Sequence, residues 1–249
     1  MQNQRNLFWL ALSFYTRLPC PQNLDYAQLP QAARFLPVIG WIVGGICAIV
    51  FYLASFFWTP TIAVLLALSV GIFVTGAFHE DGLADVFDGF GGGWTKEKIL
   101  VIMKDSRVGT YGALSLVMMI ALKVSTLSAL PVAQIPFILL AGHSISRFFP
   151  LWIMRHYEYA RTENSKTGGA MFQPAWRDLG FAGMCASAPL LLLPPLCFIT
   201  IVPSFAATLF LGRYFYKHIG GYTGDCLGAT QQITETIFYL IISGLWTFI

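Results

Sequence analysis

The chain has 249 residues, of which 56% are hydrophobic and only 11% are charged, and its mean hydropathy is +0.66. Soluble domains have about a quarter of their residues charged, so this composition argues against a soluble globular protein and predicts an integral membrane protein. The net charge of +3 comes without long basic clusters, which argues against nucleic acid as a partner.

Residues 1–34 contain only a short apolar stretch and no small-residue cleavage site, so we predict an interfacial N-terminal segment rather than a signal peptide. A helix that crosses the bilayer needs about 20 mostly apolar residues. The rest of the chain then predicts an all-α membrane bundle of about seven transmembrane helices, over residues 35–58, 59–78, 108–130, 132–152, 179–201, 202–217 and 233–249. Without internal repeats or low-complexity linkers, residues 1–249 are expected to form one membrane-embedded catalytic domain.

Lysine and arginine lie in alternate connections between these stretches, and the turns near Thr59, Pro131 and Pro203 carry none. Cytoplasmic loops collect basic residues, so the N-terminus is predicted to lie in the cytoplasm. We expect a multi-pass protein of the bacterial cytoplasmic (inner) membrane, with its active site facing the cytoplasm.

Residues 79–94, HEDGLADVFDGFGGGW, place several acids directly after an apolar run. If the helix of residues 59–78 continues through them, Asp81, Asp85 and Asp88 share one narrow stripe. Like charges at this spacing repel one another unless a cation lies between them, and Mg²⁺ prefers such oxygen ligands. The three aspartates are therefore candidate metal ligands and catalytic residues, and Glu80 is a weaker metal candidate. The alternative is an amphipathic helix end whose acids are only solvated.

Two glycines, Gly82 and Gly89, flank the acid stripe. They leave the backbone open to close approach by a ligand or by a neighbouring helix. We count both as candidate substrate-binding positions.

The next polar stretch, KDSRVGTYG, begins at Lys104 and precedes the apolar run of residues 108–130. Asp105 or Ser106 can cap that helix, while Lys104, Arg107 and the free N–H groups of its first turn make a candidate phosphate site. The alternative is that these basic residues act only as topology signals.

His143 and Arg147 are one helical turn apart beside small residues, which favours a polar cavity over an arginine that snorkels to the interface. Both are candidate substrate-binding residues. Lys123 lies in the middle of a predicted span and must face protein or water, with no role that the sequence defines.

The last polar stretch is GGYTGDCLGATQQITE, residues 220–235. Read as a helix, it places Gly221, Asp225, Gly228 and Gln232 on one stripe, with Glu235 nearby. Close helix packing explains the glycines. Asp225, Gln232 and Glu235 instead favour metal coordination or hydrogen bonds to a substrate, so Asp225 is a candidate catalytic residue and Gln232 a candidate substrate ligand.

Aligned carboxylates, basic groups near a helix N-terminus and close-approach glycines together favour phosphoryl transfer, in which metal ions neutralise a diphosphate and an alcohol attacks in line. No Walker sequence GxxxxGK[ST] is present, which argues against a P-loop enzyme.

The motifs HEDGLADVFDGFGG, MKDSRVGTYG and GGYTGDCLGATQQITE, in this order, resemble the cobalamin synthases, also called adenosylcobinamide-GDP ribazoletransferases. The resemblance implies a membrane enzyme of cobalamin synthesis with Mg²⁺ as its cofactor. Such an enzyme joins adenosylcobinamide-GDP to α-ribazole or its 5′-phosphate and releases GMP. Matched by residue, the family's acidic, basic and late motifs fall on Glu80, Asp81, Asp85, Asp88, Lys104, Asp105, Arg107 and Asp225. A homo-oligomer, or a complex with other enzymes of the same synthesis, stays open.

Three other classes of membrane protein share some of these features. CDP-alcohol phosphotransferases also carry helix-borne aspartates, but the second half of their signature is absent here. Intramembrane prenyltransferases have acid-rich repeats on two helices, and only one such cluster is obvious. A cation-coupled transporter would show two related halves of the chain and broken helices at the midplane of the membrane. The polar stretches here are instead predicted to lie on one side of the membrane.

Overall fold

The protein is an all-α bundle in a computed structural model that describes residues 2–161 and 173–248. The α-helices are α1 (Gln2–Tyr15), α2 (Leu29–Ala32), α3 (Leu36–Ala54), α4 (Pro60–Thr75), α5 (Phe78–Gly92), α6 (Lys96–Ile102), α7 (Thr110–Ser128), α8 (Ile135–Ser146), α9 (Phe149–His156), α10 (Trp176–Ser187), α11 (Ile201–Ile219) and α12 (Gly224–Leu245). Short 3₁₀ turns are η1 (Tyr26–Gln28), η2 (Ala33–Phe35), η3 (Ala188–Leu192) and η4 (Pro195–Thr200). The predicted all-α fold is confirmed.

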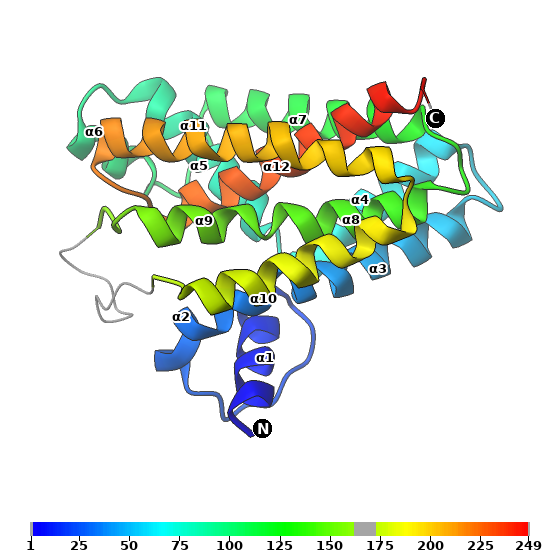
Figure 1. Cartoon of the computed structure of the whole chain (residues 1–249). Helices are drawn as coiled ribbons and strands as arrows, with labels where there is room; N and C mark the ends of the chain where they lie inside the picture. Colours follow the sequence, from blue (N-terminus) through cyan, green and yellow to red (C-terminus); the bar gives the residue numbers. More distant parts are fainter. Residues whose placement is uncertain (1, 162–172, 249) are drawn as a thin grey trace.

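The long helices lie roughly side by side, and the N-terminal helices α1 and α2 project from one side of the bundle (Figure 1). The core between α3 and α8 is closely packed, with Ile39, Val43 and Leu139 fully buried. A Cβ atom on Gly44 would lie 2.9 Å from the Cα atom of Leu140, so the glycine lets the two backbones approach. Small residues at helix contacts are typical of membrane bundles.

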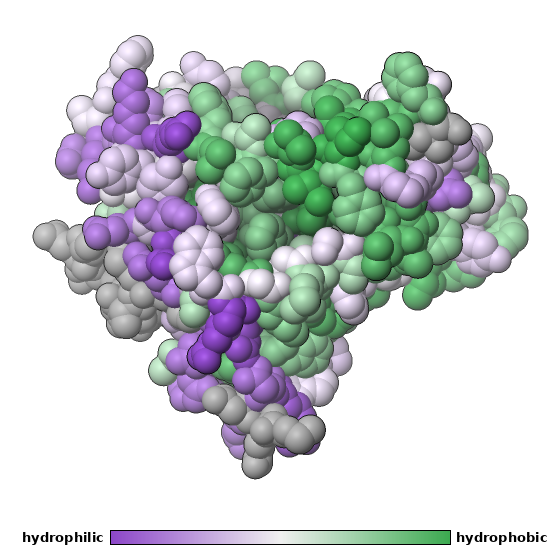
Figure 2. Space-filling view, viewed as in Figure 1, coloured by the Kyte–Doolittle hydropathy of each residue, from purple (hydrophilic) through white to green (hydrophobic). Residues whose placement is uncertain are grey.

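Among the described residues, four stretches of helix are long and apolar enough to cross a membrane: Tyr26–Ala54, Thr110–Ser128, Ile135–His156 and Pro195–Ile219. A fifth candidate is the bent pair α4 and α5, if the two helices form one span. Hydrophobic residues cover much of the bundle in Figure 2, while hydrophilic residues gather at the end that carries α6 and around α1 and α2. These features fit a multi-pass membrane protein, with four or five candidate spans where the sequence predicted about seven.

Two predicted spans differ from the observed helices. Residues 179–201 do not form one helix, because the prolines at 189, 194 and 195 break the path into α10, η3 and η4. The last helix begins at Gly224 rather than at residue 233. Its first turns bury polar side chains, among them Gln231 and Gln232, and such polar turns do not match the apolar composition of a predicted span.

The acid-rich stretch is helical, but it does not continue the preceding helix. Gly76 ends α4 with a φ of 66°, and Ala77 follows with a φ of 57°. Both residues adopt the left-handed conformation, which suits glycine and strains alanine. The chain therefore turns by 89° between α4 and α5. This turn lays α5 against α7 and α12.

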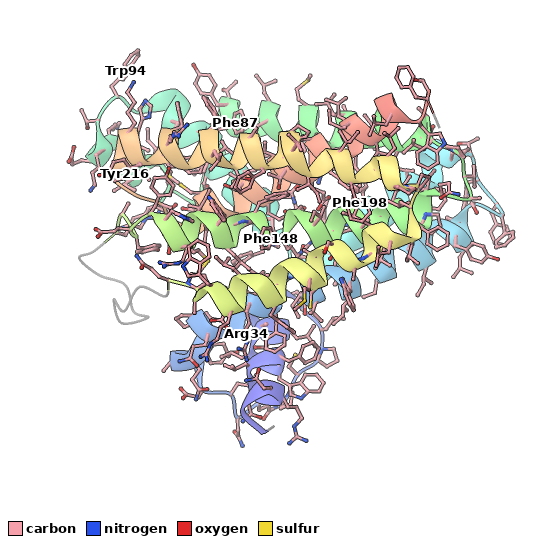
Figure 3. All side chains as sticks on the ribbon, in the orientation of Figure 1. Arg34, Phe87, Trp94, Phe148, Phe198 and Tyr216 are labelled. Carbon is pink, nitrogen blue, oxygen red and sulfur yellow. The ribbon has the colours of Figure 1, made fainter. Side chains whose placement is uncertain are left out.

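The N-terminal segment is joined to the bundle by polar contacts. The backbone N–H of Arg17 donates to the carbonyl of Val74 at 2.7 Å, next to the turn between α4 and α5. Arg34 pairs with Asp178 of α10 at 3.0 Å and lies at the base of the projecting segment (Figure 3). An interfacial position for residues 1–34 stays a prediction.

Candidate active site

Helix α5 presents its acids and its apolar residues on different sides. Asp81 is exposed and Asp85 and Asp88 are half-buried, while Leu83 and Val86 are buried in the core. The predicted acid stripe is therefore present on one helix. Phe87 does not share this burial, because 42% of it is exposed.

Asp88 caps the neighbouring helix α7. Its carboxylate accepts hydrogen bonds from the backbone N–H groups of Gly109 at 2.7 Å and Gly112 at 2.9 Å. Carboxylates stabilise helix N-termini in this way. The prediction that Asp105 or Ser106 caps α7 is wrong, since no side chain of the adjoining residues bonds the first turn. The N–H group of the N-cap Gly109 and that of Gly112 in the first turn are thus not free to bind phosphate.

Glu80 points into the bundle rather than along the acid stripe. Its Oε1 atom accepts a hydrogen bond from Gln232 Nε2 of α12 at 2.9 Å. Glu80 also lines a cavity of ≈30 Å³ together with Lys123, Arg147 and Glu235. The negative charge of Glu80 therefore compensates the buried cations Lys123 and Arg147. The other acids of the motif do not line this cavity.

Asp81 and Asp85 have the freest carboxylates of the motif, because no hydrogen bond from any described residue reaches either side chain. Asp85 interacts electrostatically with Asp225, Asp81 and Asp88, and with Arg161 as the cationic neighbour. Within residues 2–161 and 173–248 no group of three or more His, Cys, Asp or Glu side chains could hold a metal ion by itself. Two free carboxylates fit Mg²⁺ only if a substrate phosphate and water complete its shell, which is the usual arrangement for this ion.

Asp225 lies in the first turn of α12 and pairs with Arg161 at 2.9 Å. Thr223, the N-cap of α12, also donates to the Asp225 carboxylate at 3.2 Å. Burial raises the pKa of Asp225, and the Arg161 charge and these hydrogen bonds act in the opposite direction. A half-buried carboxylate with one cationic partner can accept a proton or orient a hydroxyl group.

Arg161 is the functional candidate that the sequence did not single out. It reaches Asp225 because Tyr159 and Tyr222 form a parallel backbone bridge, with Tyr222 N–H donating to Glu158 and Ala160 N–H donating to Tyr222. The two segments are 63 residues apart between Tyr159 and Tyr222. No local sequence signal predicts such a pairing.

The two basic residues of the KDSR motif lie exposed in the connection between α6 and α7. Arg107 makes a bidentate pair with Asp105, with its closest contact at 2.6 Å. These hydrogen bonds lower the pKa of Asp105 to about 2. Lys104 and Arg107 are free to meet a phosphate at the surface, although Arg107 would have to share its guanidinium with Asp105.

A buried polar cluster links α5, α7, α8 and α12. Lys123 Nζ donates to Gln232 Oε1 and Glu235 Oε1, each at 2.7 Å. His143 Nδ1 lies 3.2 Å from Glu235 Oε2, and Arg147 donates to the His143 carbonyl at 2.8 Å. His143 and Arg147 are 6% and 2% exposed and both line the ≈30 Å³ cavity, so neither faces lipid, and their role as substrate-binding residues stays a prediction. The structure therefore gives Lys123 a partner in Glu235.

The glycines near the acids serve helix packing. A Cβ atom on Gly82 would lie 2.9 Å from the Asp225 carbonyl oxygen, and one on Gly89 would meet the Met103 side chain. Of the two alternatives, a neighbouring helix rather than a ligand occupies this space. Gly221 does not share a helical stripe with Asp225, because it precedes α12. That part of the prediction is wrong.

Taken with its surroundings, the acid face of α5 offers two free carboxylates, a third carboxylate paired with Arg161, and exposed basic residues before α7. Carboxylates suit a divalent cation, and the cations suit phosphate oxygens. The arrangement is chemically suited to an in-line transfer at a diphosphate.

Comparisons with known proteins agree on one family. The family described as cobalamin-5-phosphate synthase matches residues 7–243. Adenosylcobinamide-GDP ribazoletransferase of Shewanella amazonensis is 41% identical over 254 residues, covering 99% of this chain and 98% of the relative. Enzymes of the same name from Shewanella frigidimarina and Ralstonia pickettii are 43% and 42% identical, with 96% and 95% of this chain and 94% and 93% of the relatives covered. No solved structure matches.

Proposed function

The chain belongs to the cobalamin-5-phosphate synthase family, and we propose that it catalyses the transfer that its relatives are named for. It transfers the adenosylcobinamide-phosphate moiety of adenosylcobinamide-GDP to α-ribazole or α-ribazole 5′-phosphate. The products are adenosylcobalamin or its 5′-phosphate, and GMP. The observation that carries this proposal is the match of the family over residues 7–243, which include the whole acid face of α5.

Asp81 and Asp85 are the residues that we assign to Mg²⁺. Their side chains accept no hydrogen bond from the described residues, unlike Asp88, Glu80 and Asp225. Bound there, Mg²⁺ would supply positive charge to neutralise the diphosphate, which would lower the cost of charge on the departing GMP. Lys104 and Arg107 extend from the neighbouring connection and bind the same phosphates.

Asp225 is the residue that we assign to the acceptor hydroxyl. Its carboxylate can take the proton as the hydroxyl oxygen attacks the phosphorus atom. Arg161 now pairs with Asp225, and the same guanidinium can pair with a phosphate oxygen when the substrate arrives. This exchange of partners would free the carboxylate for the hydroxyl group.

The acid face belongs to the cytoplasmic side of the membrane in this proposal. The hydrophilic surface at the α6 end of the bundle supports an aqueous position for that end, and the exposed Trp94 there suits the membrane–water interface (Figures 2 and 3). Both substrates are polar and reach the site from the cytoplasm.

A turnover assay tests the function. The full-length protein in lipid nanodiscs receives adenosylcobinamide-GDP, α-ribazole and Mg²⁺, and GMP is quantified by chromatography. We expect GMP and the cobalamin product in equal amounts, and no GMP when EDTA replaces Mg²⁺. If the purified protein releases no GMP with either form of α-ribazole, the proposed function is wrong.

A single substitution tests the metal assignment. Asp85→Asn removes one charge from the acid face without changing the size of the side chain, and it should lower the rate by at least about a hundredfold. Asp25→Asn is the matched control, since Asp25 is an exposed carboxylate of the N-terminal segment. Normal turnover of Asp85→Asn at low Mg²⁺ would remove Asp85 from the metal site.

A further inference from the structure

A second cavity, of ≈140 Å³, lies beside the first turn of α12 and is separate from the acid face. Its walls come from the end of α1, the start of α5 and α12, and the lining residues include Phe14, Tyr15, Phe78 and Gly224. Gly224 directly precedes Asp225. The cavity therefore lies beside the helical turn that carries Asp225, the residue that we assign to the acceptor hydroxyl.

Three aromatic rings form one wall of this cavity. Phe14 and Tyr15 each meet Phe78 edge to face, with ring centroids 5.4 and 5.7 Å apart. Such an arrangement offers ring faces and edges to a further flat ring. An engineered cavity of about 150 Å³ binds benzene, so the available space suits an aromatic ring system.

Three residues that line the same cavity each carry a buried polar atom without a hydrogen-bond partner among the described residues. The atoms are His79 Nδ1, Arg147 Nε and Gln231 Oε1. Their residues are 4%, 2% and 0% exposed. An unpaired buried polar atom costs about 1–3 kcal/mol, so a ligand that pairs with these atoms is favoured over a purely apolar one such as a lipid chain.

Two of these atoms can each play only one role in a hydrogen bond. Gln231 Nε2 already donates to Ser146 and to Glu235, at 2.9 and 2.6 Å, which leaves its Oε1 atom as an acceptor. Arg147 Nε can only donate. The ligand must therefore combine a flat ring, an acceptor atom and a donor such as a hydroxyl group.

We propose that this cavity binds the base of the acceptor nucleoside. Benzimidazole, the ring system of ribazole, is flat and apolar and has one free ring nitrogen to accept from Arg147 Nε or His79. Guanine carries several polar edge atoms that mostly apolar walls would leave unpaired. With the base held here, the attached ribose lies at the start of α12, and a hydroxyl group can meet Gln231 or Asp225. The identity of the nucleoside rests on the transfer reaction proposed above.

Substrate kinetics of a wall variant test the proposal. Phe14→Ala removes one ring from the partly exposed side of the cavity, and it should raise the KM for α-ribazole about tenfold. The KM for adenosylcobinamide-GDP should stay within about twofold. Phe73→Ala is the matched control, because Phe73 is 76% exposed on α4 and does not line the cavity. Equal changes in both KM values, or none, would overturn the proposal.

Equilibrium dialysis with free 5,6-dimethylbenzimidazole needs no turnover and no second substrate. The wild-type protein should bind the base, and Phe14→Ala should bind it about tenfold more weakly. Equal binding by both proteins, no binding by the wild type, or displacement of the base by GMP would show that the inference is wrong, whether or not the protein releases GMP. If binding follows the expectation and no GMP forms in the turnover assay, only the proposed function fails.

Discussion

Asp81 and Asp88 lie on one face of α5, but only Asp88 accepts hydrogen bonds from the N-terminus of α7. A carboxylate in that position stabilises the fold, because it satisfies N–H groups that the helix leaves unpaired. Asp81 is exposed and makes no such bond with the described residues. The two side chains should therefore affect stability and catalysis differently.

Alanine variants separate these roles. Asp88→Ala should lower the free energy of unfolding by about 1–2 kcal/mol, since loss of an N-cap has this cost. Asp81→Ala should leave stability unchanged and weaken the dependence of GMP release on Mg²⁺. Thermal unfolding in detergent and a Mg²⁺ titration of the rate measure the two effects. A larger loss of stability in Asp81→Ala than in Asp88→Ala would contradict the assignment.

At the scale of elements, the contact between α5 and α12 sets the position of the acid face. Gly82 lies where a Cβ atom would come within 2.9 Å of the Asp225 carbonyl oxygen. Helix α5 can therefore lie close enough to α12 for Asp85 and Asp225 to interact. A larger residue at position 82 must push the two helices apart.

Gly82→Ala tests this dependence on close packing. Overpacking of this kind costs about 1–3 kcal/mol, and the rate of GMP release should fall with the shift of Asp225. Gly45→Ala is the control, because a Cβ atom on Gly45 meets nothing within 4 Å. If Gly82→Ala keeps the unfolding temperature and the rate of Gly45→Ala, the contact does not position the site.

The buried polar cluster joins the same helices from inside. Lys123 and Arg147 are balanced by Glu235 and Glu80, and Gln232 bridges Lys123 to Glu80. Removal of one partner from a buried ion pair leaves a charge without compensation, which is strongly destabilising. The cluster thereby fixes the start of α5 against α7 and α12.

Lys123→Met should lower the free energy of unfolding by about 3–5 kcal/mol. Adding Glu235→Gln to Lys123→Met should cost less than Glu235→Gln costs alone, because the pair between Lys123 and Glu235 is already broken. Lys217→Met, at an exposed position of α11, is the control. Unfolding monitored by circular dichroism compares the variants. Additive losses in the double variant would contradict the pairing of Lys123 with Glu235.

Across the whole molecule, local periodicity predicted what lies on one helix. The spacing of Asp81, Asp85 and Asp88 gave the acid face, and the composition gave the helical membrane fold. Periodicity did not predict the hydrogen-bond and ion-pair partners that come from distant segments of the chain. Asp88 caps α7, and Asp225 pairs with Arg161. Both contacts depend on which distant segments pack together, and the spacing of residues along one helix does not encode this.

Hydropathy also failed where prolines and polar cores interrupt the pattern. Residues 179–201 are apolar enough for a span, yet prolines divide them. Conversely, α12 buries polar residues among other helices, so hydropathy placed the start of the last span at residue 233 although the helix begins at Gly224. The extent of such a helix depends on which of its side chains are buried against neighbouring helices, and not on its amino-acid composition alone.

Orientation in the membrane joins the fold to the proposed chemistry. Basic residues lie in alternate connections, and cytoplasmic loops collect them. Trp94 lies 95% exposed at the α6 end, and Phe57 lies 79% exposed in the turn between α3 and α4. If the active site faces the cytoplasm, these two positions must lie on opposite sides of the membrane.

Cysteine labelling measures this arrangement. In inside-out membrane vesicles a membrane-impermeant maleimide should label Trp94→Cys and not Phe57→Cys, and in spheroplasts the pattern should reverse. The unsubstituted chain supplies the background, because Cys20 and Cys185 are partly accessible. Trp94→Cys labelled only from the outer side would place the α6 end, with Lys104 and Arg107, away from the cytoplasm. The two substrates are polar and do not cross the bilayer unaided. They could not then reach Asp81 and Asp85 as proposed.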